Sequence, residues 1–157
     1  MAKILLKNVQ ALLEDGSVAE KNIAIENDKI VKIGEVDTSW VPDQVLDGKD
    51  KLAIPGFINT HTHASMTLLR SYADDMQLMD WLQNKIWPIE AKMSSNDIYW
   101  GAMLAVAEMI KTGTTTFVDM YSEMHRVAEA VEESGMRAVL SRGMIGVAPN
   151  GQEALAE

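Results

Sequence analysis

Short apolar, β-rich runs alternate with polar turns over the first third of the chain. Such runs occupy residues 3–9, 22–26 and 29–33, and Asn27-Asp28 between the last two suits a two-residue hairpin turn. Asp47-Gly48-Lys49-Asp50 is a further turn, placed before the short run 51–54. Residues 1–53 are therefore expected to form a small, β-sandwich-like domain.

From residue 54 the pattern changes to strands that alternate with helices. Ser94 and Asp97 have the spacing of a helix-capping pair, and Gly113 and Gly135 are placed to end two helices. The expected elements are, in order, a strand over 53–59, a helix from Ser94 to Gly113, a strand over 114–120, a helix over 123–134 and a strand over 136–142. This alternation predicts an α/β domain with parallel strands and helical crossovers, which begins at residue 54 and runs to 157.

The segment between the first strand and Ser94 is rich in Met and Trp. Residues 64–72 and 77–86 are expected to be helices, the second ended by Pro88. They follow the carboxyl end of a strand, where a substrate pocket would be built in a parallel barrel. Trp81 is a candidate pocket residue, although an aromatic residue at helical spacing also fits a core.

His61 and His63 are the main candidates for chemistry. Side chains two residues apart on a strand point to the same side, so two neutral imidazoles here can bind one divalent metal. A single histidine on an apolar strand is more often a hydrogen-bonded core residue. The position at the end of an apolar strand favours the metal interpretation.

Composition narrows the cofactors and partners. Zero cysteines exclude disulfides and thiolate ligands, so a metal must take nitrogen and oxygen donors. A net charge of −9 disfavours nucleic acids and anionic membranes as partners. No secretory signal or run of roughly 18 apolar residues is visible, so a cytoplasmic location is expected. The sequence leaves homo-oligomerisation open.

The run from Pro55 to Ala64, together with Met66–Arg70, Trp81 and Trp87–Glu90, resembles the amidohydrolase superfamily. Within it, the chain looks most like the 5-methylthioadenosine/S-adenosylhomocysteine deaminases and their chlorohydrolase-like relatives. The resemblance implies a metal-dependent (β/α)8 TIM barrel. Because a complete barrel takes about 250 residues, the 157 residues fit only about the first three of its units. A helix expected to start near Asn150 also suggests an N-terminal fragment.

The resemblance implies substrate-binding roles for Glu90 and Arg142. In these deaminases the glutamate of the Trp-Pro-Ile-Glu motif accepts hydrogen bonds from ribose hydroxyls, a task that suits a carboxylate. By composition alone, Glu90 reads as a surface carboxylate after a proline. Arg142, at the end of a strand, matches a substrate-contacting arginine, or it forms an ion pair at the barrel rim.

Two further polar residues have weaker claims. Asp119 lies near the end of a strand, where it either faces the pocket or orients a neighbouring loop. His125 is expected to be a surface residue.

The mechanism implied by the resemblance is metal-assisted hydrolysis with a nucleoside as the small-molecule substrate. One divalent ion per subunit, zinc or else iron, would be held partly by His61 and His63 and would lower the pKa of a bound water from 15.7 to about 7. Attack at C6 of adenine would then release ammonia. Family members take their other metal ligands and acid/base groups from later strands, so no further catalytic residue is assigned here and the chain alone is expected to be inactive.

Two alternatives stay open. The same scaffold could act on another substrate, as a guanine or cytosine deaminase or a triazine chlorohydrolase, because function depends on the site and not on the fold. The chain could also belong to a non-catalytic metal-binding homologue.

Overall fold

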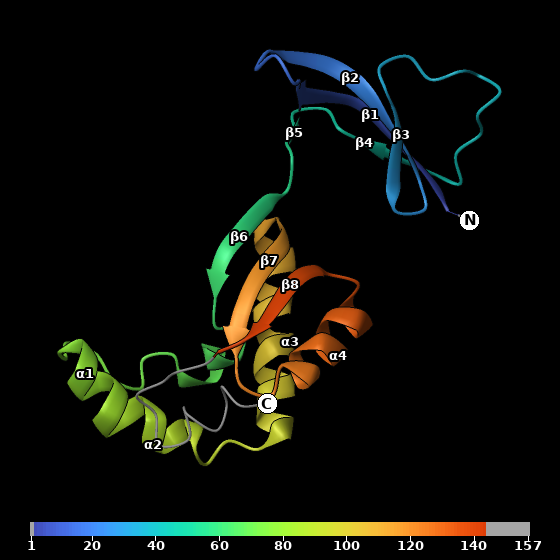
Figure 1. Cartoon of the computed structure of the whole chain (residues 1–157). Helices are drawn as coiled ribbons and strands as arrows, with labels where there is room; N and C mark the ends of the chain where they lie inside the picture. Colours follow the sequence, from blue (N-terminus) through green and yellow to red (C-terminus); the bar gives the residue numbers. More distant parts are fainter. Residues whose placement is uncertain (1, 144–157) are drawn as a thin grey trace. The chain divides into compact units, whose positions relative to one another are not determined.

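The computed structural model describes residues 2–143, which divide after Pro55 into two compact units. The first unit is a single five-stranded sheet of β1 (Lys3–Leu12), β2 (Val18–Glu26), β3 (Lys29–Ile33), β4 (Gln44–Asp47) and β5 (Leu52–Ala53). Antiparallel β1–β2 and β2–β3 pairs form its main part, and β4 and β5 add to β1 in parallel. Figure 1 shows this sheet in blue and teal.

The first unit differs from the sequence prediction in two respects. Its described residues form one sheet and not a sandwich, because β2, β4 and β5 all pair with β1. The strand expected to stop at Val9 continues to Leu12 past a bulge, where Asn8 takes a positive φ of 58° and donates its N–H to Asn22. The two-residue turn at Asn27-Asp28 is confirmed by the β2–β3 pairing.

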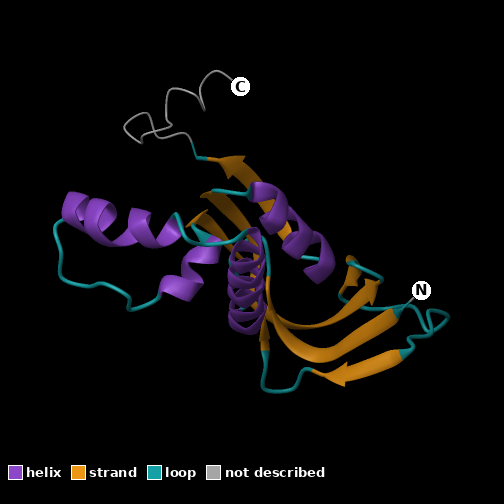
Figure 2. Ribbon diagram, turned by 90° about the horizontal axis from the view of Figure 1, so that it is seen from below, coloured by secondary structure: helices purple, strands orange, loops and turns teal. Residues whose placement is uncertain are grey.

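The second unit is a three-stranded parallel sheet whose strands are connected through helices. β6 (Phe57–Thr62), β7 (Thr114–Tyr121) and β8 (Arg137–Arg142) pair in that order, which confirms the predicted parallel arrangement. The connections carry α3 (Ser95–Thr112) and α4 (Met124–Ser134), which are labelled in Figure 1; Figure 2 shows helices in purple and strands in orange. The first strand starts later than expected, at Phe57, because Pro55 has no N–H to donate to a ladder.

Local sequence signals set the ends of these helices. Ser94 accepts a hydrogen bond from the Asp97 N–H, and Asp97 accepts one from the Ser94 N–H, so the predicted capping pair is confirmed. Gly113 and Gly135 end α3 and α4 in the left-handed conformation, with φ of 85° and 72°. Such ends favour glycine because it carries no Cβ.

The connection from β6 to α3 is helical but irregular. It contains a 3-10 helix, η1 (Ala64–Leu69), then α1 (Leu78–Trp81), a π-helical turn, η2 (Leu82–Ile86), and α2 (Trp87–Glu90). The prediction that Pro88 ends this helix is wrong. Pro88 lies in the first turn of α2, where proline is tolerated, so the helix continues to Glu90.

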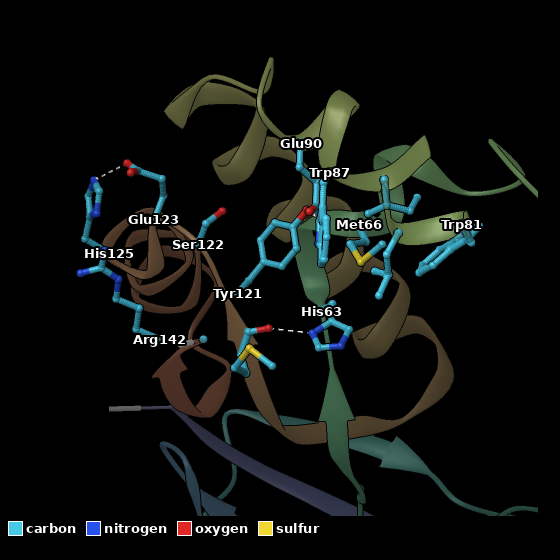
Figure 3. A pocket seen from close by; sticks show the side chains of 14 residues that line it. His63, Met66, Trp81, Trp87, Glu90, Tyr121, Ser122, Glu123, His125 and Arg142 are labelled. Carbon is cyan, nitrogen blue, oxygen red and sulfur yellow. Dashed lines mark hydrogen bonds and ion pairs between the residues drawn. The ribbon is translucent and has the colours of Figure 1, made fainter. Parts of the chain in front are cut away.

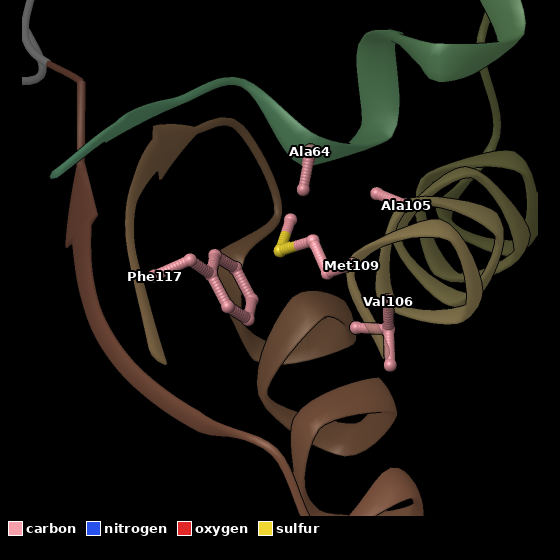
Figure 4. Packing of buried hydrophobic residues seen from close by; sticks show 5 residues of the cluster. All are labelled: Ala64, Ala105, Val106, Met109 and Phe117. Carbon is pink, nitrogen blue, oxygen red and sulfur yellow. The ribbon is translucent and has the colours of Figure 1, made fainter. Parts of the chain in front are cut away.

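The core of the second unit lies between the sheet and α3. Phe117 of β7 is fully buried against Val106 and Met109 of α3, with Ala64 of η1 in the same cluster (Figure 4). A second cluster packs Tyr121 and Val127 against Ile98 and Ala102. None of the helices within residues 2–143 is both long and apolar enough to span a membrane.

Gly101 of α3 allows η1 to pack closely against the helix. A Cβ added to Gly101 would lie 2.5 Å from the backbone oxygen of Ser65. The two segments are also joined by hydrogen bonds, from Ser65 Oγ to the Ile98 oxygen and from Thr67 Oγ1 to the Gly101 oxygen. The position of η1, which follows His63 directly, therefore depends on this contact.

We expect Gly101→Ala to lower the free energy of unfolding by about 1–3 kcal/mol, because the methyl group would overlap a backbone atom that cannot move alone. Helix propensity alone would give the opposite sign, a gain of roughly 1 kcal/mol. Urea unfolding followed by circular dichroism measures the change. Asn96→Ala, at an exposed position of the same helix, is the control; a Gly101→Ala protein as stable as this control would contradict the prediction.

Candidate metal centre and substrate pocket

The two candidate metal ligands lie side by side where β6 ends. His61 is in β6 and His63 follows it, with ring centroids 5.4 Å apart. His63 Nδ1 is 2.7 Å from the backbone oxygen of Met120 in β7. A carbonyl oxygen only accepts, so Nδ1 is the donor, and in the neutral imidazole Nε2 carries the lone pair that can bind a metal.

Asp119 is fully buried next to the segment Thr62–Ala64, the histidine turn. Its Oδ1 accepts hydrogen bonds from Thr62 Oγ1 at 2.8 Å and from the Ala64 N–H at 3.0 Å. The two donors flank His63 in the sequence. Of the two roles considered for Asp119, the geometry therefore fits orientation of a neighbouring loop. Its Oδ2 is buried without a hydrogen-bond partner among the described residues.

A cavity of about 540 Å³ opens next to His63, within the usual size range for small-molecule sites. Figure 3 shows side chains from β7, β8 and the helices after β6 around it. The lining residues are His63, Met66, Trp81, Leu82, Ile86, Trp87, Glu90, Met120, Tyr121, Ser122, Glu123, His125, Arg142 and Gly143. The cavity thus brings His63 together with Trp81, Glu90 and Arg142, whereas His61 contacts the His63 ring but is not among the lining residues.

Glu90 is held by a tyrosine at the end of β7. The Tyr121 hydroxyl donates to Glu90 Oε1 at 2.5 Å. Burial of the ring, and then the hydrogen bond to Glu90, raise the pKa of Tyr121 far above its ordinary value. The phenol therefore keeps its proton and acts as a donor across the neutral pH range.

The other lining residues contribute an apolar wall and charged groups. The Trp81 indole N–H donates to the Ala73 oxygen at 3.1 Å, which fixes the ring at the pocket wall. His125 is 64% exposed and lies 3.6 Å from a Glu123 carboxylate oxygen. His125 is thus a surface residue, as expected, but it also lines the cavity.

The donor set at this site fits a divalent metal only in part. Imidazole nitrogens suit zinc and several other metals, and His63 has the backbone partner that orients metal-binding histidines. Within the described part of the chain, no group of three or more His, Cys, Asp or Glu side chains is arranged to hold a metal ion. His61 and His63 could therefore supply two ligands of a larger set.

Sequence reasoning missed Tyr121. It ended the strand at Met120, and a tyrosine next to a buried strand reads as a core residue. The available signal was its position at the carboxyl end of a parallel strand, the edge where functional groups gather in such sheets.

The parallel strands with helical crossovers and the histidine pair at a strand end define a mixed α/β protein with a candidate metal site. Residues 52–157 match the amidohydrolase family, and the chain belongs to this family. It is 54% identical over its whole length to the 5-methylthioadenosine/S-adenosylhomocysteine deaminase of Desulfitobacterium hafniense. The enzyme of that name from Dictyoglomus turgidum is 52% identical over 98% of the chain. The chain spans 38% and 36% of the length of these relatives.

Solved structures give the same fold assignment. A zinc-bound adenosine deaminase from Xanthomonas campestris superposes with a TM-score of 0.79 at 33% identity, over 87% of this chain and 33% of the other. A zinc complex of atrazine chlorohydrolase from Arthrobacter aurescens TC1 reaches a TM-score of 0.81 at 21% identity, over 94% of this chain and 37% of the other. The second likeness shows the fold alone.

Thr62→Val tests the hydrogen bonds that hold the histidine turn. The substitution keeps the side-chain shape but removes the hydroxyl that bonds to Asp119 Oδ1 and lies 2.9 Å from the Val118 oxygen. A buried carboxylate that loses a donor should lower the free energy of unfolding by about 1–3 kcal/mol, measured by urea unfolding. Thr60→Val, at an exposed position of the same strand, is the control and should change stability little. Equal stabilities of the two variants would show that the bond contributes nothing.

Proposed function

We propose that this chain forms the N-terminal part of a metal-dependent hydrolytic deaminase for 5-methylthioadenosine and S-adenosylhomocysteine. Its products would be the inosyl compounds and ammonia. The observation that carries the proposal is one cavity lined by His63 at one side and by Glu90 and Arg142 elsewhere on its wall. The names of the relatives, similar over the entire chain, support the choice of substrate.

The proposed architecture is the start of a (β/α)8 barrel. The three parallel strands and two crossover helices correspond to about three of eight units, and the small sheet of residues 2–55 precedes them in the chain. The candidate residues lie at or after the carboxyl ends of β6, β7 and β8, which is the active-site face of such barrels. Below, "full-length protein" means a polypeptide that contains this chain and extends to the length of its relatives.

We assign the metal site to His61 and His63, with zinc as the metal and iron as the alternative. A zinc ion there would supply the water-activating chemistry of catalytic zinc sites, where the pKa of a bound water is about 7. This chain's own contribution is to hold the two imidazoles together. The Met120 oxygen fixes the tautomer of His63, and Asp119 fixes the backbone that follows it.

The substrate end of the proposed site is built by Glu90, Arg142 and Trp81. Glu90 carries two carboxylate oxygens, and Oε2 is the one that does not bind Tyr121, so it can accept from a ribose hydroxyl. The Trp81 ring provides an apolar wall for the base or the thioether. Arg142, paired with Tyr121 in the β7–β8 ladder, brings a cation to the same wall.

The full-length protein, loaded with zinc, should release ammonia from 5-methylthioadenosine and S-adenosylhomocysteine. A coupled ammonia assay and the loss of adenine absorbance measure the reaction. His63→Asn should reduce both turnover and bound zinc, the latter measured by atomic absorption, because the variant lacks one imidazole ligand. Turnover of guanine, cytosine or a chlorotriazine in preference to these nucleosides would refute the substrate assignment. Bound zinc without turnover of any of them would indicate a non-catalytic homologue.

Glu90→Gln separates ribose recognition from metal chemistry. An amide still fits the space but loses the charge that strengthens hydrogen bonds from the ribose hydroxyls, so KM for 5-methylthioadenosine should rise roughly 10- to 100-fold. Bound zinc should not change. The matched control is Glu133→Gln, because Glu133 also accepts a tyrosine hydroxyl, from Tyr99, but does so on the exposed surface. Unchanged kinetics in Glu90→Gln would favour a substrate without a ribose.

A further inference from the structure

One strand end holds groups from both parts of the pocket. The Met120 oxygen accepts from His63 Nδ1, and the next residue, Tyr121, donates its hydroxyl to Glu90. Figure 3 shows the Tyr121 ring between His63 and Glu90, and the ring centroids of His63 and Tyr121 are 6.3 Å apart. The position of Glu90 relative to His63 is therefore set through two consecutive residues of β7.

The Tyr121 ring is fixed on the side away from the pocket. Only 8% of the residue is exposed, and it packs with Ile98, Ala102, Val127 and Ala130 of α3 and α4. A ring held by this packing presents its hydroxyl in one place. Glu90, by contrast, ends the short helix α2, which follows the π-helical turn η2. The hydrogen bond thus links a side chain at the end of an irregular helical segment to a rigid core.

We propose that Tyr121 is a positioning residue that orients the Glu90 carboxylate for a vicinal diol. By occupying Oε1 with its own donor, Tyr121 directs Oε2 and the second lone pair of Oε1 toward the ligand. This inference rests on the proposed function, since it assigns the residue that prepares Glu90 for ribose. The substrate class that follows is a nucleoside with both the 2′- and 3′-hydroxyl groups.

A purely structural role for Tyr121 makes different predictions. If the bond to Glu90 only satisfied a buried phenol, its removal would lower stability without changing how the pocket discriminates between ligands. Tyr99 offers the matched comparison, because its hydroxyl donates to Glu133 Oε2 at the same distance of 2.5 Å, on the exposed surface. Tyr99→Phe thus removes the same kind of bond outside the pocket.

The test compares wild type, Tyr121→Phe and Tyr99→Phe in the full-length, zinc-loaded protein. Inosine and 3′-deoxyinosine are the probes, because they carry the product base and are not turned over. Titration calorimetry gives both dissociation constants. The dissociation constant of 3′-deoxyinosine divided by that of inosine measures the discrimination for the diol. We expect Tyr121→Phe to lower this ratio about tenfold and Tyr99→Phe to leave it unchanged. In turnover, Tyr121→Phe should raise KM and leave kcat nearly unchanged.

A double variant distinguishes the bond from a general loosening of the pocket. In a Glu90→Gln background, adding Tyr121→Phe should lower the ratio by much less than tenfold, because the oriented carboxylate is already gone. Equal discrimination in wild type and Tyr121→Phe overturns the inference even if ammonia is released. No discrimination in wild type overturns it as well. If ammonia release fails but discrimination depends on Tyr121, the proposed function falls and the inference stands.

Discussion

Burial of the Asp119 carboxylate is the constraint on which the site depends. A buried carboxylate needs hydrogen-bond donors, and Asp119 finds two of them at Thr62 and Ala64, on either side of His63. The free-energy cost of burying the carboxylate therefore falls if the histidine turn stays against β7. Parallel pairing of β6 with β7, with Thr62 opposite Asp119, provides the register in which these groups meet. The next two residues of β7 then fix His63 and Glu90.

Much of the second unit's fold could be predicted from the sequence because its signals are local. The capping pair at Ser94 and Asp97 sets the start of α3, and Gly113 and Gly135 set the ends of α3 and α4. The errors arise where tertiary context decides. Pro88 has the local signature of a helix end, yet it lies where the first turn of α2 follows a π-helical turn and tolerates its missing N–H. The bulge at Asn8 is similar, because only pairing with β2 shows that the strand continues.

The candidate site likewise contains residues that the sequence identified and one residue that only a tertiary contact reveals. Strand periodicity alone placed His61 and His63 on one side, since this depends only on neighbouring residues. Resemblance to a family selected Glu90 and Arg142, and the structure places both on the cavity that His63 lines. Tyr121 could not be found by either route. Its significance comes from a hydrogen bond to a residue 31 positions away, and no local pattern encodes a contact between a strand end and a separate helix.

The described residues supply the two parts of the proposed site unequally. The proposed substrate wall of Glu90, Trp81 and Arg142 lines one cavity, whereas the proposed metal part consists of two imidazoles. Catalytic zinc sites commonly use three protein ligands and one open position, and no such set exists within residues 2–143. The two outer strands of the described parallel sheet, β6 and β8, also expose Ile58 and Val139. A strand that paired with β6 or β8 and carried a third ligand would cover apolar surface and add to the metal ligands at the same time, which would couple the proposed chemistry to the stability of this sheet.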